Sequence, residues 1–253
     1  MATIQAEPAP ETPRRVAKHG VFFIALGLFA VAIAATAFLP EYVRFMAGHF
    51  PIAPALHVHA ALMGVWLATF VLQAGLALSG RVAAHRAIGP YGIVLGVVAW
   101  GSIVFAEVRG LIVHPLPVEL SGYDEFLQDV YADATFITFL LWAAYQRRRP
   151  AWHKRLMVIT LFLALLAPVE RLEWLPELGI GYIRASALWL DLCLVIPLIA
   201  FDLISAKRPH PATLLGLGLL LSAQAAAGLA WGWDPWRRFA FIAAHALRGA
   251  FAG

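Results

Sequence analysis

Seven apolar runs dominate the sequence, each about as long as a helix that crosses a lipid bilayer. They cover residues 20–39, 55–78, 88–106, 130–146, 155–170, 183–204 and 212–232. A spanning helix needs about 20 mostly apolar residues, because the hydrocarbon core is about 30 Å thick. Hydrophobic residues make up 61% of the chain and charged residues only 13%. The runs therefore predict an all-α polytopic transmembrane helical bundle of about seven spans.

Charged residues are unevenly distributed between the segments that join these runs. If the N-terminus is cytoplasmic, most Lys and Arg residues, including all three lysines, fall on the inner side. The outer segments instead carry Glu41, Glu107, Glu119, Asp124, Glu125, Asp129, Glu170, Glu173 and Glu177. Because translocation of Lys and Arg is disfavoured, this asymmetry predicts an N-in, C-out topology in a bacterial inner membrane. The net charge of +4 then reflects anchoring to the lipid bilayer, with no nucleic acid as a partner.

Three segments are expected along the chain. Residues 1–17 are polar and proline-rich, which predicts a disordered cytoplasmic leader. Residues 18–232 form one bundle, whose first run is too long for a signal-peptide core and is therefore retained. Residues 233–253 set tryptophans beside arginines, a pattern typical of an amphipathic helix in the outer interface. The single cysteine, Cys193, excludes a disulfide framework and a cysteine-held iron–sulfur or zinc site.

The second apolar run carries two histidines near its start. At about 100° per residue, one narrow helical stripe holds His59, Trp66 and Gln73. The opposite face holds His57 and the small residues Gly64, Ala68 and Gly75, which would let a partner helix approach closely. His59 is the better functional candidate, because it shares its face with Gln73 at membrane depth. Alternatively, both histidines bind lipid head groups or loop carbonyls.

The sixth run contains ionisable residues on one helical stripe, namely Arg184, Asp191 and Asp202. A charged group inside a membrane costs about 2.5–3.5 kcal/mol on the insertion scale, so Asp191 is expected to face a cavity or a partner. A structural ion pair with Arg184 is the alternative. Asp202, near the inner face, is expected to be a cap or a residue that reaches the interface.

Titratable residues from several other runs fall in the same outer half of the bundle. Asp129 and Asp133 lie one helical turn apart, Glu107 closes the third run, and Arg171 closes the fifth. Each is ordinary helix-end chemistry by itself. Together they predict a polar vestibule on the outer side, built from His59, Gln73, Asp133, Arg171, Arg184 and Asp191.

The histidines also raise the possibility of haem. A transmembrane b-type haem needs histidines paired at matching depth from different helices. The inner level offers His85 with His153, and the outer level offers His59 with His57 or His114. The alternative for His85 and His153 is an interfacial turn in which the neighbouring Arg and Lys residues bind phosphate. No lysine lies in any run, which excludes a retinal Schiff base, and no nucleotide-binding glycine loop occurs.

An ordered series of landmarks resembles a bacterial family of polytopic inner-membrane proteins known as hypothetical proteins or domains of unknown function. The landmarks are Leu56–His59 with Trp66 and Gln73, HRAIG at 85–89, WHKRLM at 152–157 with Arg171, and Asp202 followed by HPATL at 210–214. The likeness spans nearly the whole chain. It implies the polytopic architecture and supports the choice of residues, but it implies no activity. A more distant likeness to helical b-type cytochromes is architectural only, because the histidine pairing departs from theirs.

These observations lead to three alternative functions. The leading hypothesis is a redox-linked protein that handles haem or quinone, with His59 as outer ligand or quinol partner and Asp191 as proton acceptor. Arg171 or Arg184 would then bind an anion or a haem propionate. The second is a proton-coupled carrier for a small solute, in which Asp191 titrates. The third is an accessory or assembly subunit that docks on a membrane-protein partner through Gly64, Ala68 and Gly75.

Overall fold

The computed structural model describes residues 13–49, 51–113, 122–172 and 196–251, and every regular element in these ranges is helical. The longer helices are α1 (Pro13–Met46), α2 (Pro54–Leu78), α3 (Val82–Val113), α4 (Gly122–Tyr145), α5 (Pro150–Leu163), α8 (Pro211–Ala230) and α9 (Asp234–Phe251). Shorter ones are η1 (Gln146–Arg148), α6 (Leu166–Glu170) and an unlabelled helix, Ile196–Ala206. The predicted all-α class is therefore confirmed for the described residues. Helix α1 begins inside the segment that was expected to be a leader.

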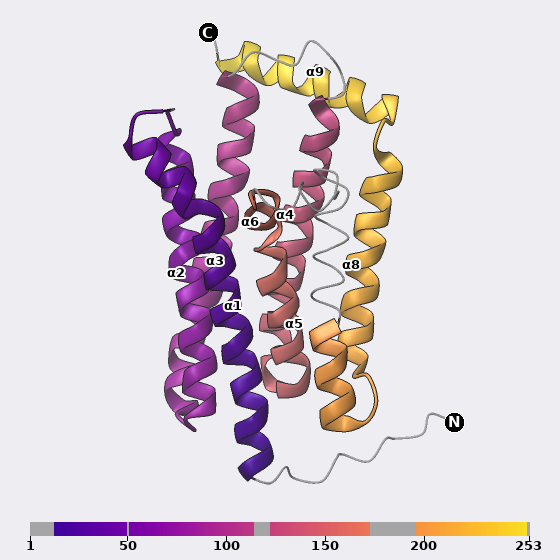
Figure 1. Cartoon of the computed structure of the whole chain (residues 1–253). Helices are drawn as coiled ribbons and strands as arrows, with labels where there is room; N and C mark the ends of the chain where they lie inside the picture. Colours follow the sequence, from indigo (N-terminus) through magenta and orange to yellow (C-terminus); the bar gives the residue numbers. More distant parts are fainter. Residues whose placement is uncertain (1–12, 50, 114–121, 173–195, 252–253) are drawn as a thin grey trace, which may run out of the picture.

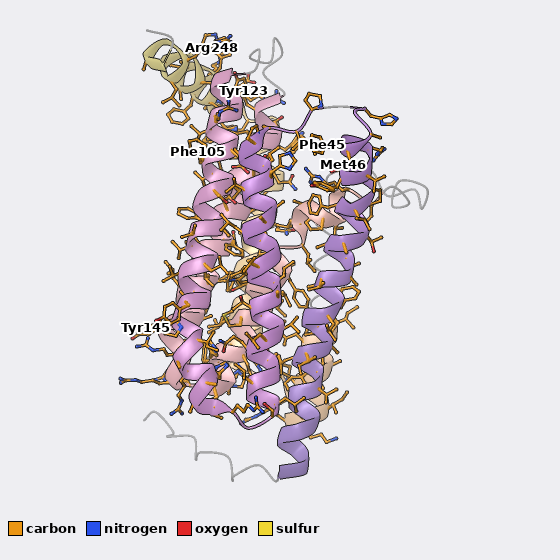
Figure 2. The ribbon with its side chains drawn as sticks, turned by 90° about the vertical axis from the view of Figure 1, so that its left-hand side faces the viewer. Phe45, Met46, Phe105, Tyr123, Tyr145 and Arg248 are labelled. Atoms are coloured by element: carbon orange, nitrogen blue, oxygen red, sulfur yellow. The ribbon has the colours of Figure 1, made fainter. Side chains whose placement is uncertain are left out.

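Four of the described helices are long and apolar enough to cross a membrane. They are Gly20–Met46 within α1, Pro54–Leu78, Val82–Gly110 within α3, and Pro211–Ala230. Their outer surfaces are apolar. Met46 of α1 and Phe105 of α3, both labelled in Figure 2, are 68% and 62% exposed. Large apolar side chains left in contact with solvent across a whole bundle are suited to lipid. The chain is thus an integral membrane protein with several apolar helices.

The long helices run side by side, and α9 lies across one end of them (Figure 1). Helix α2 packs against α1 and α3, while α4 packs against α5 and α8. Helix α1 starts at the end opposite α9. We call this opposite end the basic end, because the turns there carry Arg81, Arg86, Arg147, Arg148, Arg149, Lys207 and Arg208. The other end is called the α9 end.

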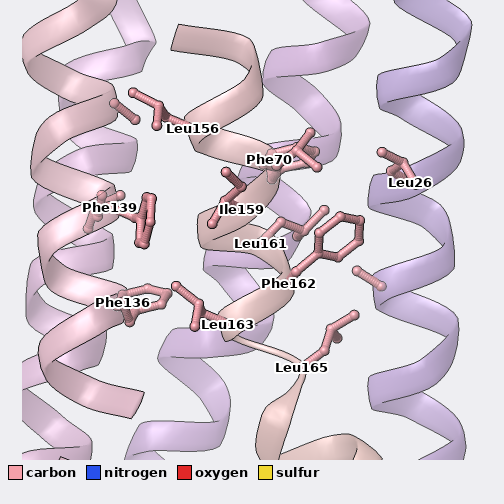
Figure 3. Packing of buried hydrophobic residues seen from close by; sticks show 14 of the residues in the cluster. Leu26, Phe70, Phe136, Phe139, Leu156, Ile159, Leu161, Phe162, Leu163 and Leu165 are labelled. Carbon is pink, nitrogen blue, oxygen red and sulfur yellow. The ribbon is translucent and has the colours of Figure 1, made fainter. Parts of the chain in front are cut away.

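Helix α5 is the centre of the bundle. From Arg155 to Leu163, every residue except Met157 is buried, so this helix is enclosed by protein on all sides after its first turn. Figure 3 shows Ile159 and Phe162 of α5 among Phe139 of α4, Phe70 of α2 and Leu26 of α1. With 14 residues, α5 is about 21 Å long, shorter than the hydrocarbon core of about 30 Å.

The expected fifth span, 155–170, is not one helix, and Pro168 gives the reason. Proline has no N–H to donate to the carbonyl four residues earlier, and its ring clashes with that carbonyl, here Ala164. The helical hydrogen-bond pattern is interrupted just before Pro168. There the Leu165 N–H donates to the Phe162 carbonyl, three residues earlier, at 2.9 Å. Helix α6 then restarts at Leu166 and leads toward the α9 end. Residues 183–195 of the expected sixth span lie outside the described residues.

Close packing against α2 depends on glycines of its neighbours. A Cβ added at Gly27 of α1 would lie 3.0 Å from Phe70, and one added at Gly92 of α3 would lie 3.1 Å from Thr69. By contrast, Gly64 and Gly75 of α2 itself have open space around them. Among the described residues, none packs closely against these two glycines. The role of the small-residue face of α2 as a docking surface for another membrane protein stays a prediction.

Candidate functional site

His59 joins α2 to α3 in the half of the bundle nearer to α9. Its Nδ1 lies 3.2 Å from the Ala99 carbonyl oxygen and 3.1 Å from the Ser102 hydroxyl. A carbonyl oxygen only accepts, so Nδ1 carries the proton and Nε2 keeps a lone pair in the neutral ring. His57, two residues earlier, packs instead on α1, with its ring centroid 4.8 Å from that of Phe45. The prediction that these two histidines face opposite sides is confirmed.

A carboxyl pair lies between α3 and α4, toward the α9 end. The side chains of Glu107 and Asp133 are within hydrogen-bonding reach of each other, and Asp129 is near enough to act on both electrostatically. Two carboxyls can share a hydrogen bond only if one of them carries a proton. One Asp133 oxygen is buried with no hydrogen-bond partner among the described atoms, as is the indole N–H of Trp100 on the same side of α3.

Arg171 is fixed at the outer edge of α1. Its Nε lies 3.5 Å from Glu41 Oε2, and its guanidinium sits 5.2 Å from the ring centroid of Phe38. The carbonyl of Ala167 also accepts from Arg171 Nη1 at 2.9 Å. Arg171 therefore already has an anionic partner that the sequence did not indicate.

Gln73 and His85 meet at the basic end, where α2 and α3 are joined by a short turn. His85 Nδ1 lies 3.2 Å from the backbone oxygen of Gln73. With its amide oriented to satisfy its neighbours, Gln73 donates to the His85 carbonyl at 3.1 Å and to His85 Nδ1 at 2.5 Å, and it accepts from the Gly89 N–H at 3.2 Å. Gln73 is 14 residues from His59, about 21 Å along the helix, so it does not belong with His59 in one outer vestibule.

His153 approaches His85 from the first turn of α5. The two ring centroids are 6.3 Å apart, with the planes at 77°. His153 Nδ1 donates to the Ala143 carbonyl of α4 at 2.8 Å. Burial lowers the pKa of His153, which favours the neutral imidazole, the form that binds metals. Four helices thus converge on this pair of rings.

A buried ion pair, two residues after His153 in α5, connects this helix to the helices that follow residue 195. Arg155 donates through Nε to Asp202 Oδ1 at 2.8 Å and through Nη2 to the same oxygen at 2.5 Å. Asp202 Oδ2 accepts from Thr213 Oγ1 at 2.5 Å and from His210 N–H at 2.8 Å. Asp202 is completely buried. The expectation of a cap or interface-seeking residue is replaced by an internal anchor with every oxygen satisfied.

Of the predicted vestibule residues that the structure describes, Gln73 lies apart from the others, at the basic end. In the outer half, His59 contacts Ser102, and Glu107 meets Asp133 between α3 and α4. At the inner level Gln73, His85 and His153 lie together. Arg184 and Asp191 lie outside the described residues. Sequence reasoning missed the role of Arg155, although its place in WHKRLM beside the expected start of an apolar run was a usable signal. No family model, curated protein or solved structure matches the chain.

Proposed function

We propose that the protein is a redox-linked membrane protein that binds haem b through His85 and His153. The observation that carries this proposal is the 6.3 Å separation of the two ring centroids, contributed by α3 and α5. A metal ion held between two imidazole nitrogens at about 2 Å each separates the centroids by about 6 Å, so the rings fit.

Haem also suits the number of ligands. No group of three or more His, Cys, Asp or Glu side chains that could hold a bare metal ion occurs among the described residues. A haem iron needs only two protein ligands, because the porphyrin supplies the rest, and the bound group supplies one-electron chemistry. His57 and His59 cannot form an equivalent outer pair, since they contact different helices.

The protein's own residues prepare the two imidazoles. His153 Nδ1 donates to Ala143, so Nε2 of that ring remains for a ligand. His85 would bind through Nε2 in the tautomer whose Nδ1 donates to the Gln73 backbone oxygen, with the Gln73 side-chain oxygen turned toward the ring. Ligating histidines commonly bond their other nitrogen to a carbonyl in this way, which fixes ring orientation and tautomer. Gln73 holds the α3 backbone at His85, and its side chain thereby acts as a positioning residue.

Absorption spectra of the detergent-purified protein, loaded with haem, test this proposal. We expect a low-spin Soret band that is lost in both His85→Ala and His153→Ala. The matched control His59→Ala should keep the band, because His59 bonds only to α3. Where a variant is suspected of misfolding, added imidazole should restore the low-spin spectrum of His153→Gly. A wild type without the band, or a band that survives in both variants, would overturn the proposal.

A second function, a proton-coupled carrier, is favoured by the Glu107–Asp133 pair. Carboxyls that exchange a proton between two helices are what such carriers use at membrane depth. In proteoliposomes with an internal pH dye, wild type should take up protons with its solute, and Glu107→Gln and Asp133→Asn should not. Asp234→Asn, which changes an exposed carboxylate of α9, is the matched control and should transport normally. Equal proton uptake by all four proteins would refute the carrier.

We also propose that the basic end faces the bacterial cytoplasm, giving an N-in, C-out topology. The clustering of cations on the turns at this end, away from α9, supports this orientation. Alkaline phosphatase fused after residue 253 should then be active, whereas a green fluorescent protein fused there should stay dark. The reverse result would invert the topology.

A further inference from the structure

Helix α9 is fixed firmly to the bundle along one side. Arg237 makes a two-pronged ion pair with the buried Asp124 of α4, with Nη2 2.5 Å from Oδ2 and Nε 3.0 Å from Oδ1. The Trp236 indole N–H donates to the Tyr123 carbonyl at 2.8 Å. Ala240 and Ala244 pack on the buried Tyr123 ring. This side of α9 is therefore occupied by contacts with the bundle.

The rest of the α9 surface divides into two arcs of different chemistry. At about 100° per residue, the arc on one flank of the bundle-facing side is apolar and consists of Phe239, Ile242 and Ala246. Phe239 and Ile242 are 64% and 65% exposed. The arc on the other flank is cationic or polar, and consists of Arg238, His245 and Arg248, all exposed. Phe239 and Arg248 are nine residues apart, which puts them on opposite sides of the helix.

The position of α9 decides what its apolar arc can meet. The helix runs across the spanning helices and contacts α3 and α4 (Figure 1). Viewed nearly along its axis, it sits at the edge of the bundle on the side away from α1, with Arg248 at the upper rim (Figure 2). A helix perpendicular to the spans lies parallel to the bilayer plane. One flank thus points toward acyl chains and the other toward water.

We propose that α9 is a lipid-binding helix, which inserts its Phe239–Ile242 arc at the acyl boundary and binds anionic phosphates through Arg238 and Arg248. Aromatic and aliphatic residues beside arginines on one amphipathic helix are suited to this interface. Charge complementarity selects anionic head groups, because no acidic residue follows Asp234 in α9. The helix binds lipid laterally while Asp124 and Tyr123 hold it to the protein.

Spin labels at the two flanks test this assignment. In a Cys193→Ser background, nitroxides are attached at Phe239→Cys and Arg248→Cys, and the full chain is placed in nanodiscs of phosphatidylcholine with phosphatidylglycerol. For each label we compare its collision rate with oxygen, which dissolves in lipid, to its collision rate with a water-soluble nickel chelate. This ratio should be several-fold higher at 239 than at 248. Equal ratios at both positions, or a label at 239 exposed to the chelate, would overturn the proposal and leave a protein partner as the occupant of this arc.

The head-group part is tested separately. In nanodiscs that contain phosphatidylglycerol, the label at 239 should lie deeper than in nanodiscs of phosphatidylcholine alone. The double substitution Arg238→Gln and Arg248→Gln, with the label kept at 239 or placed at 242, should remove this difference in depth. Label depth that does not depend on phosphatidylglycerol with both arginines intact would refute anionic lipid as the ligand.

Discussion

At the scale of single residues, the Arg155–Asp202 pair is the most deeply buried of the described ion pairs. Asp202 has no exposed surface, and its two oxygens accept from a guanidinium, a hydroxyl and a backbone N–H. Removing one partner of such a pair leaves an uncompensated charge in a low-dielectric environment. The pair therefore makes the protein sensitive to either partner's loss, whatever its net contribution to stability is.

Asp202→Asn should destabilise the protein strongly, because Arg155 keeps its charge and loses its counter-ion. The expected cost is about 3–5 kcal/mol, the usual range for breaking a buried pair. Thermal melts in detergent measure the effect. The matched control is Glu41→Gln, which breaks the half-exposed Arg171–Glu41 pair and should cost less than about 1 kcal/mol. Similar melting temperatures for both variants would contradict the buried anchor.

His210 adds a pH dependence to the same region. Its Nδ1 accepts from the Ala212 N–H at 3.0 Å and so caps α8, which requires the neutral ring. Burial, together with the charge of Arg155, lowers the pKa of His210 from 6.5 to about 4. The unfolded chain then binds the proton more tightly than the folded one. Stability contributed by the cap should be complete above pH 6.5 and should fall as pH drops toward 4.

Melting temperatures measured between pH 7.5 and pH 4 check this expectation, within the window set by the ordinary and lowered values. His210→Asn keeps an acceptor at the cap without a titrating group, so its melting temperature should vary less over the same window. A wild type and an Asn variant with the same pH dependence would show that another group is responsible.

At the scale of helices, periodicity explains why much of α2 could be predicted. His59, Trp66 and Gln73 were expected on one stripe, and all three face α3, through Ser102, Gly96 and His85. The helical periodicity of α2 shows which face a residue is on but not how deep in the membrane it lies. Gln73 was therefore grouped with His59 although 14 residues separate them.

Pairing between helices was beyond the sequence for a different reason. Glu107 meets Asp133 because α3 packs against α4, and Arg155 meets Asp202 across 47 residues of chain. Which helices become neighbours depends on the packing of the entire bundle, and no local pattern encodes it. The break between α5 and α6 does not interrupt the apolar run, which continues through Pro168, so the sequence predicts one span there.

The contact of α3 with its neighbours gives a prediction at this scale. A Cβ at Gly96 would lie 2.7 Å from both Leu140 Cδ2 of α4 and Trp66 Nε1 of α2, all in a packed core. Gly96→Ala should therefore cost about 1–3 kcal/mol through overpacking. Gly101→Ala, on the same helix with nothing within 4 Å, is the matched control. A chemical-denaturation midpoint that changes equally in both would contradict close packing at Gly96.

At the scale of the whole molecule, the Arg237–Asp124 ion pair helps to hold α9 to α4. Hydrogen bonds from Arg237 hold the pKa of Asp124 below its ordinary value of 3.8, against the opposing effect of burial. The folded protein thus favours the carboxylate, and its contribution to stability is present above that value. The contribution is lost as pH falls through the lowered pKa, so α9 should loosen only below about pH 4.

Hydrogen exchange of the α9 amides in detergent measures this loosening. Exchange should be slow and constant between pH 7 and pH 5 after correction for the intrinsic rate, and should accelerate in acid before the bundle itself opens. Asp124→Asn should exchange quickly at every pH, while Asp234→Asn, which removes only a pair at 3.9 Å, should behave like wild type. Fast exchange in wild type at pH 7 would show that Arg237 does not hold the helix.

The Arg155–Asp202 link also orders events at the ribosome. Arg155 is synthesised 47 residues before its carboxylate, an interval of about 2–10 s at roughly 5–20 residues per second. Throughout that interval an unmatched guanidinium sits at the threshold of the helix that ends up innermost. Helix α5 must therefore wait near the water boundary, or beside the insertion machinery, until the C-terminal segment emerges. This ion pair is therefore formed late, after most residues of the apolar core in α1 to α5 have already been synthesised.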